Sequence, residues 1–342
     1  MNYRKIAKVS LLLVYLVIIA GAVVRMTGSG MGCPDWPKCF GYYIPPTEIA
    51  DLEWKPDHDY KTGQVIIREN TLRVAAGNFQ SGETYDEGQW KAYTRHDYAE
   101  FNVFHTWTEF LNRLLGALAG IATLVMAVAS FSYWKRDKFV TLGSCFVVLA
   151  MGFQAWLGAT VVYSVLAPAK ITIHMLMALA IVAILLLLIY RTSRAKDDHK
   201  KDTLLRNLLI LALGLTVVQV VLGTQVRQFV DQRIDLFGEE AKAFWLKDPG
   251  ISFYIHRSFS ILVVLLNSFL AYRIYQLRLG FDKIKWVLGL IMVEILTGIA
   301  MVYLDFPFAS QPLHLVLASL LFGLQFYLVL EVVYAGRNFK TS

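Results

Sequence analysis

Eight long apolar stretches recur along the 342-residue chain, and they constrain its fold more than any other feature. Each has about 18 or more residues, enough to cross about 30 Å of hydrocarbon as a helix that satisfies its own backbone hydrogen bonds. Hydrophobic residues make up 56% of the chain, more than a soluble domain of this length carries. The sequence therefore predicts an all-α integral membrane protein with eight transmembrane helices. We place them at about 8–27, 102–132, 139–163, 170–190, 204–227, 252–276, 284–304 and 311–334.

The formal net charge of +7 is distributed in a way that indicates topology. Lysines and arginines gather at the chain start and in every second connection, at 4–8, 135–138, 191–201, 273–285 and 337–340. Under the positive-inside rule these clusters are cytoplasmic, so both termini face the cytoplasm of a multi-pass inner or plasma membrane protein. We assign the excess charge no nucleic-acid partner, and we expect membrane lipid around the helices.

The chain contains an internal repeat. Gln154–Tyr163 matches Glu294–Tyr303, and a histidine follows each tyrosine after the same interval, His174 in the first copy and His314 in the second. Four helices return the chain to its starting side, so the repeat is parallel. We predict two tandem pseudo-symmetric four-helix bundles, 1–195 and 196–342.

The two halves differ most in the first extracytoplasmic loop, where residues 28–100 replace a much shorter second-half connection. Alternation over Thr62–Ala75 predicts a short hairpin in this insertion. Cys33 and Cys39 lie near its start, in a compartment that permits a disulfide. A zinc site is the weaker alternative, because no paired histidines lie nearby.

Four histidines, His105, His174, His256 and His314, fall near the external ends of the even-numbered helices. Ionisable side chains inside a membrane need a partner or a task, and imidazole is a common axial ligand of haem iron. The histidines could instead be hydrogen-bonded between helices. Their matched depth favours haem, and zinc is disfavoured because we expect no cysteine or carboxylate beside the second-half pair.

One face of the second helix carries His105, Glu109, Asn112 and Arg113. Glu109 could form an inert i,i+4 pair with Arg113, or it could be a proton-transfer group beside a bound macrocycle. Four arginines lie near the histidine level and could either bind haem propionates or anchor the helix ends at the interface: Arg25, Arg113, Arg227 and Arg257.

These motifs resemble the haem A synthase family. The resemblance covers nearly all of the chain outside 41–100. Its most specific part is the run from Gly21 to Cys39, GAVVRMTGSGMGCPDWPKC. The other matching motifs are Glu109-x-x-Asn112-Arg113, His174, His256-Arg257 and His314.

The resemblance implies an enzyme that oxidises the C8 methyl of haem O to the formyl group of haem A by successive hydroxylations, for cytochrome oxidase assembly. It implies a haem b cofactor in the second half on His256 and His314, and substrate haem in the first half with Glu109 as catalytic residue. It also implies the Cys33–Cys39 pair as a family feature, and a haem O synthase and an electron donor or acceptor as partners.

The sequence departs from the commonest family pattern at one position of the first half. Asn112 stands where the commonest family pattern has a histidine, and an amide is a poor haem ligand. His105 is the natural substitute for the iron, although it lies two turns away, about 10 Å along the axis. The other options are His174 alone or a haem without a second ligand.

Two other functional classes fit the pattern less well. A non-catalytic membrane di-haem b-type electron carrier would use all four histidines and would not need Glu109. A transporter is disfavoured by the parallel repeat and by helices without central prolines.

Overall fold

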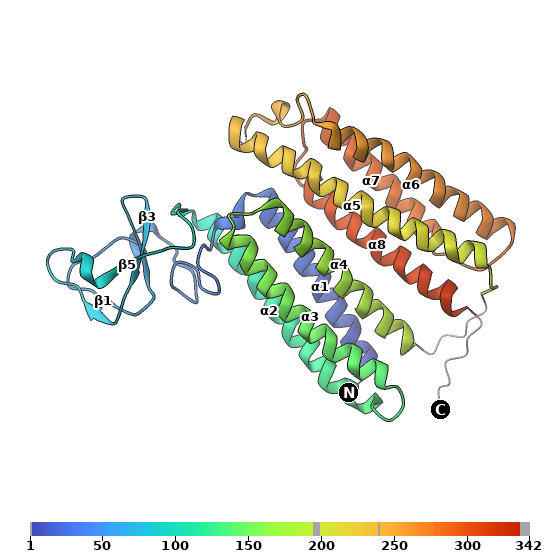
Figure 1. The fold of residues 1–342 in the computed structure, drawn as a ribbon, viewed down its shortest axis with the longest axis horizontal. Helices are drawn as coiled ribbons and strands as arrows, with labels where there is room; N and C mark the ends of the chain where they lie inside the picture. The colour runs from blue at the N-terminus through green and yellow to red at the C-terminus, as the bar shows by residue number, and fades with distance from the viewer. Residues whose placement is uncertain (1, 194–198, 239, 336–342) are drawn as a thin grey trace.

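The computed structural model describes residues 2–193, 199–238 and 240–335 (Figure 1). Within those ranges, eight helices are long and apolar enough to cross a membrane, which confirms the predicted multi-pass membrane protein. They are α1 (Tyr3–Met26), α2 (Val103–Ser130), α3 (Lys138–Tyr163), α4 (Pro168–Arg191), α5 (Thr203–Phe237), α6 (Ile251–Gln276), α7 (Ile284–Tyr303) and α8 (Ser310–Tyr334). Four residues of the predicted basic clusters, Arg194, Lys196, Arg337 and Lys340, lie outside the described residues.

Short polar residues fix several helix starts. The side chains of Asn102, Asp137 and Asp202 each accept a hydrogen bond from a backbone N–H in the first turn of α2, α3 and α5. Pro168 occupies the first turn of α4, where its missing N–H costs nothing. The apolar stretches therefore begin close to where the sequence predicts.

Helix α5 runs ten residues past its predicted end at residue 227 and stops at Gly238, whose φ is +86°. The extension contains Asp231, Arg233 and Asp235, so its composition is polar although its conformation is helical. Hydropathy identifies the apolar segment and not the helix end, which explains the difference. The extension matters because it brings Asp231 to the candidate site.

The first four helices pack around one apolar core and the last four around another (Figure 1). Helices α1, α4, α5 and α8 form the contact between the two groups. Leu179, Val220 and Phe322 pack together there. At Gly323 of α8 the helices are close: a Cβ there would lie 2.2 Å from the Tyr15 hydroxyl of α1, so a larger residue would require the Tyr15 side chain to shift.

The insertion between α1 and α2 holds all five strands of the described chain. β2 (Val65–Arg68) and β3 (Thr71–Ala75) form the predicted hairpin, and β5 (Trp90–Ala92) adds to β3. Both turn residues, Glu69 and Asn70, have positive φ, the geometry that suits a two-residue hairpin. β1 (Asp59–Tyr60) pairs with β4 (Phe79–Gln80). The fold is therefore helical in its membrane part, with a small β region outside it.

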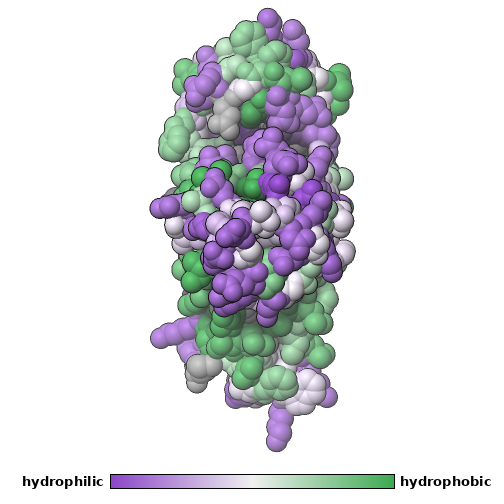
Figure 2. All heavy atoms as spheres, turned by 90° about the vertical axis from the view of Figure 1, so that its left-hand side faces the viewer, coloured by the Kyte–Doolittle hydropathy of each residue, from purple (hydrophilic) through white to green (hydrophobic). Residues whose placement is uncertain are grey.

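The insertion extends from one end of α1 and α2 (Figure 1), and the face it presents in Figure 2 is largely hydrophilic. By contrast, many large apolar side chains of the spanning helices are exposed, for example Leu12, Leu149 and Ile261. Exposed apolar surface on long helices is expected where lipid is the solvent.

Candidate functional site

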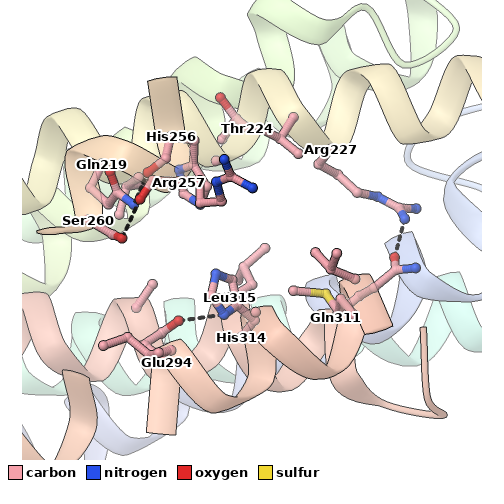
Figure 3. A pocket seen from close by; sticks show the side chains of 18 of the residues that line it. Gln219, Thr224, Arg227, His256, Arg257, Ser260, Glu294, Gln311, His314 and Leu315 are labelled. Atoms are coloured by element: carbon pink, nitrogen blue, oxygen red, sulfur yellow. Dashed lines mark hydrogen bonds and ion pairs between the residues drawn. The ribbon is translucent and has the colours of Figure 1, made fainter. Parts of the chain in front are cut away.

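A cavity of about 340 Å³ lies among α5, α6, α7 and α8 (Figure 3). This volume falls in the range of cofactor pockets, about 300–1,000 Å³. Most of its wall is apolar, and its polar groups include His256, Arg257 and His314. Ala22, Arg25, Met26 and Met175 of the first four helices also contribute to the wall.

His256 and His314 face each other across this cavity from α6 and α8 (Figure 3). Their ring centroids are 6.4 Å apart. A bond from a metal to an imidazole nitrogen is about 2 Å and that nitrogen lies about 1 Å from the ring centre, so two imidazoles on opposite sides of one metal have centres about 6 Å apart. The residues present therefore fit a haem iron held between two histidines.

Glycines on the neighbouring helices make room for these imidazoles. A Cβ on Gly223 of α5 would lie 3.2 Å from Cε1 of His256. A Cβ on Gly298 of α7 would lie 3.8 Å from Cε1 of His314. Each ring thus packs on a helix backbone, which limits the directions in which its nitrogens can point.

In the first four helices, too, polar side chains pack against glycines of a neighbouring helix. A Cβ on Gly158 of α3 would lie 3.3 Å from Cε1 of His174, and a Cβ on Gly21 of α1 would lie 4.0 Å from Oδ1 of Asn112. Asn112 therefore lies against α1 as His256 lies against α5. His174 Nδ1 and Asn112 Oδ1 are buried without a hydrogen-bond partner among the described residues.

His105 lies in the first turn of α2, where its backbone N–H donates to the side chain of Asn102. Its ring lies beside Phe104, with centroids 6.0 Å apart, and it does not line the cavity between His256 and His314. The structure thus separates His105 by nearly two helical turns from the Asn112 position that matches His256.

Glu109 and Arg113 connect α2 to the loop that begins the insertion. The Glu109 side chain accepts a 2.7 Å hydrogen bond from the Cys33 N–H and is 2.5 Å from Arg113 Nη2. Arg113 also donates to the carbonyl oxygens of Cys33 and Lys38. Glu109 is 4% exposed, so this carboxylate is held inside the protein by the i,i+4 pair and by the loop.

Cys33 and Cys39 form the disulfide that the sequence favoured over zinc. Asp35, between them, accepts hydrogen bonds from the backbone N–H groups of Phe40 and Gly41. Burial raises the pKa of the Asp35 carboxyl, although those N–H groups and nearby Arg113 act to lower it. The disulfide loop is therefore a compact unit fastened to α2.

The four candidate arginines have different surroundings. Arg25 of α1 and Arg227 of α5 each lie 2.8 Å from a different oxygen of Asp231, and we call these three residues the inter-half ion cluster. Arg227 also donates to Gln311 and to the Arg25 carbonyl oxygen. Arg257 lines the cavity and stacks over Phe253 and Tyr254, while Arg113 contacts the disulfide loop.

Comparison with known proteins identifies the family. Residues 4–80 and 74–326 match COX15-CtaA, described as a cytochrome oxidase assembly protein. The chain belongs to the COX15-CtaA family.

Similar proteins of known name are haem A synthases. The chain is 26% identical to that of Shewanella oneidensis over 226 residues, an alignment covering 65% of this chain and just over half, 56%, of that protein. It is 21% identical to that of Flavobacterium psychrophilum and 23% identical to that of Flavobacterium johnsoniae. Each Flavobacterium alignment covers 92% of this chain and 93% of the relative.

One expectation about this COX15-CtaA protein is wrong. A carboxylate does accompany the second-half histidines, because Glu294 Oε2 lies 2.6 Å from His314 Nδ1. The repeat contained the signal, since Glu294 occupies the place of Gln154, twenty residues before the histidine in both halves. Even so, no cluster of three or more histidine, cysteine, aspartate or glutamate side chains able to hold a metal ion occurs in the described part of the chain.

Two further residues near the cavity were missed. Asp231 lies in the α5 extension, beyond the predicted apolar segment. Gln311 is the second residue of α8 and receives a hydrogen bond from Arg227. The sequence could indicate Asp231 only if the helix were continued past residue 227, which places it one turn after Arg227.

Proposed function

We propose that this COX15-CtaA protein is a haem A synthase, an oxidoreductase that converts the C8 methyl of haem O to the formyl group of haem A for cytochrome oxidase assembly. The observation that carries the proposal is the family match along almost the whole chain, 4–80 and 74–326. The two histidines 6.4 Å apart across an apolar cavity support it independently.

The second half, 196–342, is the proposed cofactor domain of a pseudo-symmetric pair. His256 and His314 would hold haem b by one ring nitrogen each, and Arg257 and Arg227 would neutralise its propionates. Haem b bound there supplies one-electron redox chemistry. The apolar wall excludes water, and the glycine contacts orient the two imidazoles.

The first half, 1–195, is the proposed substrate domain. His174 is its proposed iron ligand, because its ring packs on Gly158 in the way His314 packs on Gly298. His105 is the less favoured second ligand, because Asn112 and not His105 takes the position matching His256. Arg25 and Arg113 remain candidate propionate partners, although Asp231 and the disulfide loop already engage them.

Glu109 is the proposed catalytic carboxylate. Conversion of a methyl to a formyl group is a four-electron oxidation. When water supplies the oxygen atom, four protons and four electrons leave, so the site then needs a proton acceptor and an electron acceptor. Glu109 is a buried carboxylate on α2, and the Cys33 N–H and Arg113 fix both its oxygens. It would take protons at these oxygens, with Arg113 compensating its charge.

The proposed orientation places both termini in the cytoplasm and the haem sites near the extracytoplasmic face. Basic residues at the ends of α1, α4 and α6 opposite the insertion support it, as does the Cys33–Cys39 disulfide, which forms in oxidising compartments. The proposed partners are membrane lipid, a haem O synthase that delivers the substrate, and an electron donor or acceptor.

Pigment analysis tests the activity. The chain is expressed in a membrane host that makes haem O but no haem A, and extracted haems are separated. We expect haem A. Haem B and unchanged haem O alone, with folded protein in the membrane, would refute the proposal.

A matched pair of variants tests whether Glu109 takes part in the reaction, a role that a di-haem b electron carrier would not need. Glu109→Gln keeps the size of the side chain and removes its charge, and we expect haem A to fall by about 10²-fold or more. Glu100→Gln changes an exposed carboxylate just before α2 and serves as control. If Glu109→Gln retains its second-half haem and still makes haem A at the control level, Glu109 has no role in the reaction.

A further inference from the structure

Glu294 of α7 lies beside His314 of α8 and, like it, lines the cavity (Figure 3). Its Oε2 is 2.6 Å from His314 Nδ1. Thr297, one turn further along α7, places its Oγ1 2.8 Å from the same nitrogen. Two oxygens of α7 thus converge on one ring nitrogen of a proposed iron ligand.

These contacts favour the tautomer of His314 that carries its proton on Nδ1. When the Thr297 hydroxyl donates its hydrogen to the Glu294 carbonyl oxygen, 2.9 Å away, its oxygen accepts from the imidazole. A Glu294 carboxylate also only accepts. Nδ1 is therefore the donor, and Nε2 keeps its lone pair for a metal ion.

The charge of Glu294 has an unusual environment. Its second oxygen, Oε1, is buried without a hydrogen-bond partner among the described residues, and its partner on the other oxygen is an imidazole. A carboxylate in a membrane interior is costly unless a positive charge complements it. An iron centre on the opposite nitrogen of His314 would supply that charge.

The first half lacks this arrangement. Gln154 occupies the matching position on α3, but its Nε2 donates to the backbone carbonyl oxygen of His174 at 3.0 Å. The His174 ring nitrogen Nδ1 is left without a partner in the described chain. The repeat therefore provides a natural comparison between an amide and a carboxylate behind the proposed iron ligand.

We propose that Glu294 is a positioning residue that orients His314 and lowers the reduction potential of the second-half haem. The proposal rests on the proposed haem b site. A negative charge hydrogen-bonded to an axial imidazole favours the ferric centre, which carries one more positive charge than the ferrous centre. The two halves would thus hold haems of different potential because their matching residues are glutamate and glutamine.

Spectroelectrochemistry of the purified full-length protein tests the proposal. In Glu294→Gln the amide oxygen can still accept from Nδ1 while the charge is lost. We expect the haem to remain bound by two histidines and its midpoint potential to rise, with the equilibrium constant for reduction increasing about tenfold or more. Glu331→Gln, which alters another buried carboxylate of the same half that pairs with Lys283, should leave the potential unchanged.

Further variants separate the possible outcomes. Glu294→Leu removes the acceptor as well, and we expect about 10- to 100-fold weaker haem retention. Glu294→Asp keeps the charge one methylene further back, so a smaller rise in potential tests the same direction if Glu294→Gln does not accumulate. An unchanged potential in Glu294→Gln, with haem lost in His314→Ala, would overturn the role of Glu294 and leave the haem site standing. A wild-type protein without a haem held by two histidines would overturn both.

Discussion

The glycines behind the imidazoles allow a graded prediction. In Gly223→Ala the new Cβ would lie 3.2 Å from Cε1 of His256, whereas in Gly298→Ala it would lie 3.8 Å from Cε1 of His314. Carbon atoms pack best at about 3.5–4.0 Å, so the second variant fits and the first forces the His256 ring away by a few tenths of an ångström. Overpacking of this kind costs about 1–3 kcal/mol. We therefore expect Gly223→Ala to weaken haem binding by about 5- to 150-fold, since 1.4 kcal/mol is tenfold.

Gly223→Ala should weaken haem binding, whereas the alanine itself should favour the helix. The two measurements therefore distinguish the packing effect from a general loss of stability. Alanine is a better helix former than glycine by about 1 kcal/mol. In the haem-free protein the His256 ring is free to turn away from the new methyl group, so neither variant should lower the thermal stability of the haem-free protein. Haem binding is measured by adding haem to the purified apoprotein and following the absorbance of the ligated form. Equal affinities for Gly223→Ala and Gly298→Ala, or a larger loss in Gly298→Ala, would refute the packing of His256 on α5.

Four other outcomes are expected. Gly32→Ala would place a Cβ 2.4 Å from the His105 carbonyl oxygen, so proteolysis should cut the insertion faster than in Gly77→Ala, where a Cβ meets no atom within 4 Å. His105→Ala should leave the haem-to-protein ratio and the reduced spectrum unchanged, and a lost absorbance band would show that His105 binds iron. Asp231→Asn removes the shared anion of the inter-half ion cluster and should lower the free energy of unfolding by about 1–3 kcal/mol in detergent, seen as a lower melting temperature. Because the folded Asp35 carboxyl has a raised pKa, the folded loop binds protons more readily than the unfolded one, so loop stability should fall as pH rises from about 4 through that pKa, and Asp35→Asn should flatten this dependence in hydrogen exchange.

The sequence predicts the membrane part well because lipid imposes simple rules. A span must be apolar and must satisfy its backbone internally, so Tyr3–Met26 and the other seven helices follow from hydropathy and length. The hairpin of Val65–Arg68 and Thr71–Ala75 was also predicted, from the alternation of polar and apolar residues within 62–75. The α5 extension to Phe237 was missed because its polar residues resemble those of a loop.

The sequence predicted the main residues of the candidate site but not the contacts between them. The repeat identified His256 and His314, yet hydropathy and spacing cannot say that Glu294 reaches the His314 ring while Gln154 reaches a backbone carbonyl. Whether each of these side chains reaches the imidazole ring or the backbone depends on its direction between two packed helices. The Glu109 contact with Cys33 depends in turn on how a loop folds back, and no local pattern encodes that.

The cavity between α5 and α8 includes Arg25, which belongs to the other half and is tied to Asp231 across the contact. A molecule filling the cavity therefore touches both halves and binds best when they are docked. Binding and docking are then thermodynamically linked, so a ligand of this cavity would stabilise the docked arrangement by mass action, and docking would raise the affinity for that ligand by the same factor. Filling of the cavity would in this way favour the assembled helical bundle.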